Sequence, residues 1–130
     1  MREIKFRAWD VLDKKMLNWG DICHLPAWEI FPGTPEQRPF NIMQYTGMED
    51  KNGREIYEGD IIEFLENESG ETWTAKIVFE NLAFKALDVE DEAYDYDFDD
   101  LSDIEVIGNI YENPKLLPDS RDYPISILKI

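Results

Sequence analysis

The chain has 130 residues and a mass of 15.3 kDa, which fits one domain, and 43% of its residues are hydrophobic, enough to bury a core. Its 29 acidic and 13 basic residues give a net charge of −16. This charge disfavours nucleic acid as a partner and excludes docking on an anionic membrane surface, since both of these polyanions attract Lys and Arg.

Several other classes of protein are also disfavoured. No apolar run is long enough to span a membrane and no signal-peptide pattern is present, so we expect a cytoplasmic protein. Cys23 is the single cysteine and His24 the single histidine, so one chain provides neither a disulfide nor a Cys/His zinc site. No nucleophile has a base and an orienting group placed with it. We therefore expect no enzymatic activity, no catalytic or cofactor-binding residues, no cofactor and no metal.

The N-terminal segment predicts a β-hairpin. Residues 2–9 alternate as in a half-buried strand, with Ile4, Phe6 and Ala8 on one face and Lys5 and Arg7 on the other. Residues 10–15 are polar enough for a turn, and residues 16–19 predict the returning strand.

A proline-rich segment follows the hairpin. Residues 23–40 contain four of the seven prolines: Pro26, Pro32, Pro35 and Pro39. Proline fixes φ and lacks an N–H, so neither a helix nor a central strand is expected here. We predict an irregular connector.

Four residues in the next segment are predicted to form structural turns. Asn52-Gly53 is typical of a type I′ turn, in which both central residues have positive φ. Gly59 allows a sharp bend, and Asp60 is a candidate to cap the backbone of that bend. Strands are predicted over residues 61–64, 72–79, 84–89, 94–98 and 104–111.

The C-terminal segment predicts little helix. Asn113 and Pro114 are typical of an N-cap followed by proline at the first helical position, so one helical turn is expected over residues 115–117. The tail beyond it contains four apolar residues, Ile125, Ile127, Leu128 and Ile130. We expect an ordered tail that closes an edge of its own sheet or adds to a neighbouring subunit. No long helical periodicity occurs, so the protein should be mainly β.

An acidic run supplies the candidate functional residues. Residues 86–114 hold eleven acidic residues and no base. The candidate partner surface is formed by Asp95, Asp97, Asp99 and Asp100. A calcium-binding loop is disfavoured, because its sixth position would be Asp100 instead of Gly and its twelfth Val106 instead of Glu. A solvated acidic face, a surface for a basic partner and a weak cation site remain as alternatives.

Aromatic residues alternate with these acids. On a strand, Tyr94, Tyr96 and Phe98 would share one face and the carboxylates the other. An outer strand that packs its rings inward is one interpretation. The other is nucleic-acid mimicry, in which spaced carboxylates imitate phosphates.

Several motifs together resemble those of the YopX family, proteins of phages and prophages that come mostly from Gram-positive bacteria. The motifs occupy residues 2–10 (REIKFRAWD), 15–16 (KM), 43–47 (MQYTG), 50–53 (DKNG), 55–61 (EIYEGDI) and 107–114 (IGNIYENP). The resemblance covers residues 1–117. It implies a mainly β fold with a small SH3-like barrel and self-association, and it carries over no catalytic residues.

The predicted organisation is a single YopX-like domain over residues 1–130. It has a hairpin and connector over 1–46, barrel-forming strands over 47–113, and a helical turn and tail over 114–130. We expect few or no long helices.

The function expected first is that of a non-enzymatic phage accessory protein in the host cytoplasm, a protein-interaction or homo-oligomeric module. An acidic inhibitor that occupies a host nucleic-acid-binding protein is the alternative. A small nucleic-acid-binding barrel is the second alternative, and its basic patch would draw on Lys5, Arg7, Lys14, Lys15 and Arg38.

Overall fold

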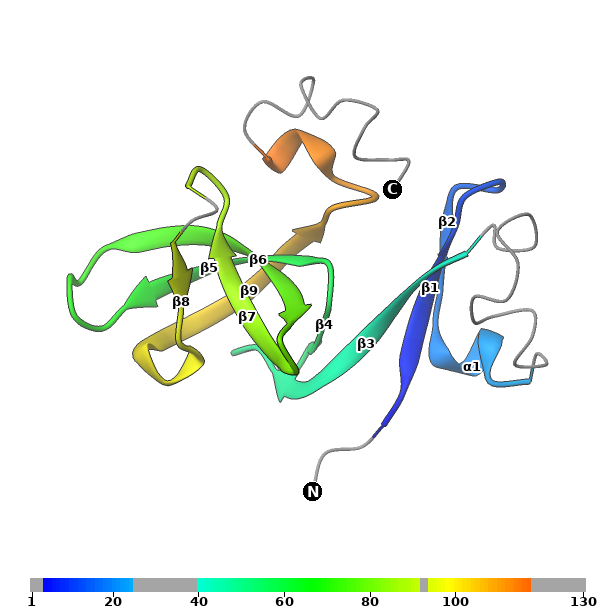
Figure 1. Ribbon diagram of the computed structural model, residues 1–130, viewed down its shortest axis with the longest axis horizontal. Helices are drawn as coiled ribbons and strands as arrows, with labels where there is room; N and C mark the ends of the chain where they lie inside the picture. Colours follow the sequence, from blue (N-terminus) through cyan, green and yellow to red (C-terminus); the bar gives the residue numbers. More distant parts are fainter. Residues whose placement is uncertain (1–3, 25–39, 92–93, 118–130) are drawn as a thin grey trace. The chain divides into compact units, whose positions relative to one another are not determined.

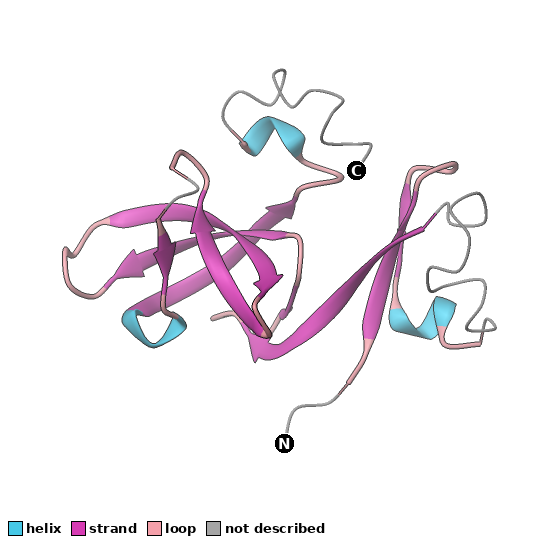
Figure 2. Ribbon diagram, viewed as in Figure 1, coloured by secondary structure: helices cyan, strands magenta, loops and turns pink. Residues whose placement is uncertain are grey.

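The computed structural model describes residues 4–24, 40–91 and 94–117, and strands dominate these segments (Figures 1 and 2). The chain forms two compact units, Met1–Glu58 and Gly59–Ile130. The first contains β1 (Phe6–Asp10), β2 (Lys15–Leu17), α1 (Trp19–Ile22), β3 (Phe40–Glu49) and β4 (Glu55–Tyr57). The second contains β5 (Asp60–Glu66), β6 (Thr72–Glu80), β7 (Ala83–Asp88), β8 (Asp95–Tyr96), the 3-10 helix η2 (Phe98–Asp100), β9 (Leu101–Asn109) and the 3-10 helix η3 (Pro114–Leu116). The predicted mainly β fold without long helices is confirmed.

The first unit is an antiparallel sheet with the strand order β2-β1-β3-β4. β1 and β2 form the hairpin that the sequence predicts, with Ala8 opposite Leu17. β3 pairs with the other edge of β1 and places Ile42 opposite Ala8. This pairing joins strands on either side of the proline-rich segment, so β3 and β4 extend the first unit past the hairpin region expected over 1–46.

A short helix ends the hairpin earlier than predicted. Asn18 Oδ1 accepts the N–H of Asp21 at 2.9 Å, and Asp21 Oδ2 accepts the N–H of Asn18 at 3.1 Å. This reciprocal capping box satisfies two N–H groups that the helix leaves without partners and starts α1 at Trp19. The prediction that the returning strand reaches residue 19 is therefore wrong.

Burial around β1 departs from the predicted alternation at two residues. Ile4 precedes the strand and is 66% exposed, whereas Arg7, predicted on the outward face, is only 8% exposed. The Arg7 guanidinium carbon lies 4.8 Å from the centre of the Tyr57 ring, and its Nε donates to Met43 Sδ at 3.4 Å. Because neighbouring side chains cover both faces of this central strand, its outward face is also interior.

The second unit is an antiparallel sheet with the strand order β8-β7-β6-β5-β9, and Figure 1 shows it curling into a half-barrel. Consecutive hairpins join β5 to β8, and β9 returns through η2 to pair with β5. The predicted combination of an N-terminal hairpin region and a small SH3-like barrel is confirmed, the barrel as this curled half-barrel.

The core of the second unit comes from buried residues of all its strands, with consecutive buried residues in β5 and β7. Its buried side chains include Ile62, Phe64, Ala75, Ile77, Ala86, Tyr96, Leu101 and Val106. The Phe64 and Tyr96 rings meet edge to face with their centres 4.8 Å apart. Full burial of one large apolar side chain contributes about 1.5–3 kcal/mol, so this core is the main source of stability in the unit.

The end of β9 differs in detail from the prediction. The strand ends at Asn109, two residues before the predicted end, and η3 follows at Pro114. Asn113 makes no side-chain cap to η3; its Oδ1 accepts the N–H of Asn109 at 3.0 Å instead. A Cβ on Gly108 would lie 2.5 Å from that oxygen, so any other residue there would force the Asn113 side chain to shift. Asn113 thus occupies the predicted N-cap position before Pro114, and its carbonyl oxygen accepts the N–H of Leu116 at 3.0 Å, but its side chain turns back toward the strand.

Two predictions fall wholly or largely outside the described residues. Of the irregular connector, the structure describes Cys23, which is exposed, His24, and Phe40, which begins β3. The predicted ordered tail lies at residues 118–130, beyond the described segments.

Candidate functional site

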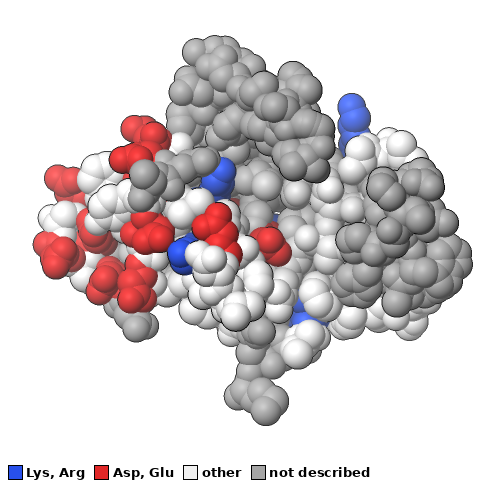
Figure 3. All heavy atoms as spheres, viewed as in Figure 1, with Lys and Arg blue, Asp and Glu red and all other residues white. Residues whose placement is uncertain are grey.

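The four candidate carboxylates lie where β8 leads into η2. Asp95 belongs to β8, Asp97 follows it, and Asp99 and Asp100 belong to η2. Asp95, Asp97 and Asp100 are exposed, and for Asp99 the structure describes the backbone. In the face that Figure 3 shows, acidic side chains gather over the strands of the second unit, on the left of the view.

Strand pairing brings further acidic residues to this region. The N–H of Asn67, in the turn between β5 and β6, donates to the carbonyl oxygen of Asp100 at 3.0 Å. The same turn carries Glu68 and Glu71, both exposed. Sequence reasoning did not connect this turn with the acidic run, because the two meet only through the pairing of β5 with β9.

The aromatic residues near β8 divide between the core and the surface. Tyr96 is 8% exposed, and its hydroxyl donates to Asp88 Oδ2 at 2.7 Å. Tyr94 is 50% exposed and lies against Tyr96 with ring centres 4.8 Å apart. The inward packing expected for all the alternating rings is therefore wrong for Tyr94, which precedes the two-residue strand.

Asp88 is a buried carboxylate that organises the chain after β7. Its Oδ1 accepts the N–H groups of Glu90 at 2.8 Å and Asp91 at 3.0 Å. Burial, and then the hydrogen bond and negative charge of Asp88, raise the pKa of Tyr96 well above its usual range, so this phenol stays protonated. Sequence reasoning missed the role of Asp88, because one carboxylate among eleven shows no distinguishing pattern.

One ion pair borders the candidate surface. Lys85 Nζ lies 3.6 Å from Asp95 Oδ2, with the two side chains 30% and 51% exposed. A pair this exposed contributes less than about 1 kcal/mol to stability. The pair places the Lys85 ammonium at the border of the candidate surface.

The turn at Asn52-Gly53 differs in type from the prediction. Gly53 has a φ of +84°, but Asn52 does not have positive φ, so the type I′ assignment is wrong. Gly53 N–H donates to the carbonyl oxygen of Asp50 at 2.9 Å, and Asp50 Oδ1 accepts the N–H groups of Asn52 and Arg54, each at 2.9 Å. The Asp50 side chain thus stabilises a different turn.

The second predicted bend lies where the second unit begins. Gly59 has a φ of +90°, and its N–H donates to the carbonyl oxygen of Ile77 at 2.8 Å. Its own carbonyl oxygen accepts the N–H of Ile110 at 2.9 Å. Asp60 follows as the first residue of β5 and is fully buried.

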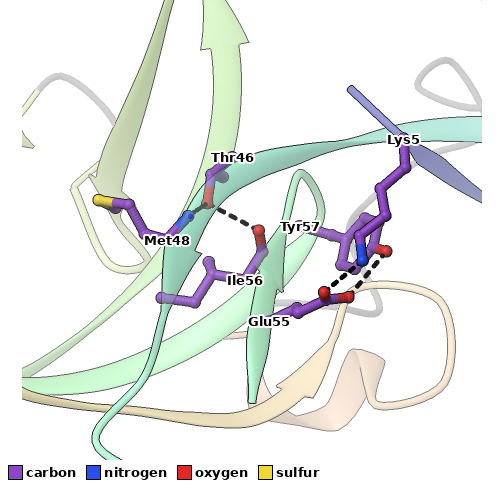
Figure 4. Close-up of polar contacts among 6 residues, drawn as sticks. All are labelled: Lys5, Thr46, Met48, Glu55, Ile56 and Tyr57. Atoms are coloured by element: carbon purple, nitrogen blue, oxygen red, sulfur yellow. Dashed lines mark hydrogen bonds and ion pairs between the residues drawn. The ribbon is translucent and has the colours of Figure 1, made fainter. Parts of the chain in front are cut away.

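A separate polar group lies within the first unit (Figure 4). The Glu55 carboxylate pairs with the Lys5 ammonium and accepts the Tyr57 hydroxyl at 3.2 Å. Burial, followed by the charge and hydrogen bond of Glu55, raises the pKa of Tyr57 to about 12. Beside it, Thr46 Oγ donates to the carbonyl oxygen of Ile56 at 2.7 Å. The Thr46 bond joins β3 to β4, and the Lys5–Glu55 pair joins the residue before β1 to β4.

Two other kinds of site are absent from the described segments. Within them, no three His, Cys, Asp or Glu side chains are grouped so as to hold a metal ion. No helix in the described part of the chain has both the length and the apolar character needed to cross a bilayer.

The fold and the surface define a class: a small, mainly β protein with an acidic, curled half-barrel. A family model described as YopX protein matches residues 5–118, and the chain belongs to this family.

Solved structures extend the comparison. Protein EF1440 from Enterococcus faecalis has 28% identity and a TM-score of 0.63, with 90% of this chain and 99% of that chain covered. Protein yopX from Bacillus subtilis has 21% identity and a TM-score of 0.55, with 87% and 97% covered. Among curated proteins, none matches significantly. These likenesses support the fold.

Proposed function

We propose that this chain is a non-enzymatic protein-interaction module, encoded by a phage or prophage, that contacts a basic partner through Asp95, Asp97, Asp99 and Asp100. The observation that carries the proposal is the uneven charge of the molecule. The second unit holds 19 acidic and 5 basic residues, and the described carboxylates around η2 face solvent.

Physical reasoning favours a partner over a purely solvated face. Like charges held close together destabilise a compact state through mutual repulsion. A basic partner relieves that repulsion and gains long-range attraction during encounter. The exposed Tyr94 ring beside these carboxylates adds the amphipathic contact that protein interfaces favour.

Capture from a lysate of the host cell, followed by binding with the purified partner, tests this proposal. The variant replaces the four candidate carboxylates, Asp95, Asp97, Asp99 and Asp100, by Asn. A control removes the same charge elsewhere in the unit, through Glu63→Gln, Glu90→Gln, Asp103→Asn and Glu112→Gln, all exposed residues. We expect salt-sensitive binding that the first variant loses and the control retains. Equal binding by both variants would show that the site is misplaced.

We also propose that the chain self-associates, as the family resemblance implies. Size-exclusion chromatography with light scattering at tens of micromolar should then show a stable multimer. A monomer at that concentration contradicts the oligomeric part of the proposal and leaves the acidic surface to be tested separately.

Nucleic-acid mimicry is the second candidate, and the exposure of Asp95, Asp97 and Asp100 along one short segment favours it. A mimic competes with nucleic acid for its partner. Addition of this chain should release labelled DNA from the captured partner, and the four-Asn variant should not. A partner that binds DNA and this chain together excludes mimicry.

A further inference from the structure

The hairpin between β6 and β7 ends in a strained two-residue turn. Asn81 and Leu82 have φ values of +52° and +67°, and Glu80 pairs with Ala83 across the turn. Positive φ at both central residues is the type I′ geometry, which Asn-Gly satisfies best. Leucine at such a φ is strained, because its Cβ crowds the backbone.

The Leu82 side chain is not buried in the fold, so its burial does not offset this strain. It is 91% exposed, so it leaves almost all of its apolar area in water. Glycine at this position would relieve the backbone and remove the exposed surface together. A leucine kept in a strained, exposed position is therefore better explained by an intermolecular contact than by folding.

Aromatic rings continue this apolar surface from the tip along the hairpin. Phe79 and Phe84 face each other across β6 and β7, with ring centres 4.8 Å apart. Phe79 is 38% exposed. This end of the hairpin thus carries three apolar side chains that are exposed at least in part, Phe79, Leu82 and Phe84.

A hollow of about 280 Å³ lies beside this surface, and Phe84 belongs to both. Tyr96 and Phe98 supply further aromatic walls, and Asp95 and Asp97 supply carboxylates. Aromatic faces and carboxylates together suit a side chain with an aliphatic stem and a cationic head, which is the chemistry of Lys and Arg.

The hollow already accommodates one cation of this chain. Lys85 lines it, with its ammonium 3.6 Å from Asp95 Oδ2. This pair is partly exposed, so an incoming guanidinium can compete for the same carboxylate at little cost.

We propose that the β6–β7 tip and the adjacent hollow dock an extended segment of a basic protein, with an Arg or Lys entering the hollow and a neighbouring apolar residue packing on Leu82 and Phe79. Charge complementarity selects this occupant, because the apolar surface lies in the acidic unit, between Glu80 and the Asp95–Asp97 carboxylates. The inference rests on the proposed function and specifies its contact point.

Fluorescence anisotropy with two labelled heptapeptides tests the docking point. One probe carries arginine between two leucines, and the other carries citrulline, its neutral analogue, at the same position. We expect the full chain to bind the arginine probe about tenfold more tightly. Leu82→Gly and Asp95→Asn should each weaken that binding about fivefold or more, and Lys85→Gln should strengthen it.

Matched variants separate docking from folding. Leu12→Gly removes another exposed leucine, 76% exposed in the turn after β1, and Asp103→Asn removes another exposed carboxylate. Both should bind the arginine probe as the unmodified chain does. Thermal melting should show Leu82→Gly folded and no less stable than the parent, so that lost binding reports on contact.

Equal binding of the two probes, or unchanged binding by Leu82→Gly, overturns the docking point. The proposed function is then still decided by the captured partner and the four-Asn variant, which do not involve Leu82. If the peptide results hold while the captured partner ignores the four-Asn variant, the docking point stands and the proposed function is wrong.

Discussion

The first unit, Met1–Glu58, holds 10 acidic and 8 basic residues, whereas the second, Gly59–Ile130, holds 19 acidic and 5 basic. Their net charges are therefore −2 and −14. The first unit places cations in its interior, with Arg7 over the Tyr57 ring and Lys5 paired to Glu55. The described carboxylates of the second unit face solvent, apart from a few such as Asp60 and Asp88.

This difference shows that the charge of −16 is not a general property of the surface. In the first unit, Arg7 and Lys5 are used for packing and for pairing within the fold, whereas Lys14, Lys15, Lys51 and Arg54 are exposed. In the second, apolar packing holds the strands, and most of the described carboxylates are exposed. The acidic half-barrel is thus the unit in which an interaction surface is to be sought.

The largest expected effect tests whether the acidic unit depends on its apolar core. Phe64 is 1% exposed and packs against Tyr96. Phe64→Ala should lower the free energy of unfolding by about 3–5 kcal/mol, through lost burial and the cavity left behind. Urea denaturation measures the change. A loss below about 1 kcal/mol would contradict the assigned core.

A second substitution tests the internal use of charge in the first unit. Arg7→Ala removes the guanidinium from the Tyr57 ring together with its packed stem, and should cost about 1–3 kcal/mol. Lys15→Ala, at an exposed residue of β2, is the control and should stay within about 0.5 kcal/mol. Similar losses for both variants would remove the distinction between interior and surface charge.

The stability of the chain at alkaline pH tests one buried tyrosine in each unit. The pKa values of Tyr57 and Tyr96 are raised, the former to about 12, from an unfolded value near 10. At pH values between the unfolded and the folded pKa, only the unfolded chain loses the phenolic protons. The contribution of these tyrosines to stability is therefore complete below pH 10 and falls as pH rises beyond it. Tyr57→Phe and Tyr96→Phe should each reduce the loss of unfolding free energy with rising pH, by on the order of 1 kcal/mol at pH 11. Melting curves between pH 9 and 11 test the slope; an unchanged slope in both variants contradicts the assignment.

The smallest effects compare one turn in each unit. Gly53 has a φ of +84° and open space where a Cβ would be, so Gly53→Ala should cost about 1 kcal/mol through backbone strain alone. Leu82→Gly should act in the opposite direction and stabilise the chain by about 0.5 kcal/mol. Chemical denaturation distinguishes the signs, and destabilisation by Leu82→Gly would show that Leu82 supports the fold.

Local patterns were sufficient for most strands, because half-buried strands alternate apolar and polar residues. They failed at two turns, although the bend at Gly59 has the positive φ that was expected. At Asn52-Gly53 the Asp50 carboxylate stabilises another geometry, and at Asn81-Leu82 a type I′ turn forms without the residues that usually mark it. In the second case, the pairing of Glu80 with Ala83 leaves only two residues to connect β6 with β7.

The candidate carboxylates could be found from the sequence, but their surroundings could not. Asp95 and Asp97 are conspicuous in an acidic run. The hollow beside them also needs Phe84 from β7, and that contact depends on the antiparallel pairing of β7 with β8. The exposed Leu82 lies outside the run and has no local feature that identifies it as a surface residue.

The sequence by itself determined the mainly β class, the family, the positions of most strands and the concentration of acidic residues, because these follow from composition, local periodicity and short motifs. Only the tertiary structure decided that Arg7 is interior, that the Asn113 side chain bonds back to Asn109 and that Leu82 stands exposed at a strained tip. Alternation separates the two faces of a strand but does not say whether one or both are covered. That depends on pairing between distant strands, which the sequence encodes only through the packing of the whole chain.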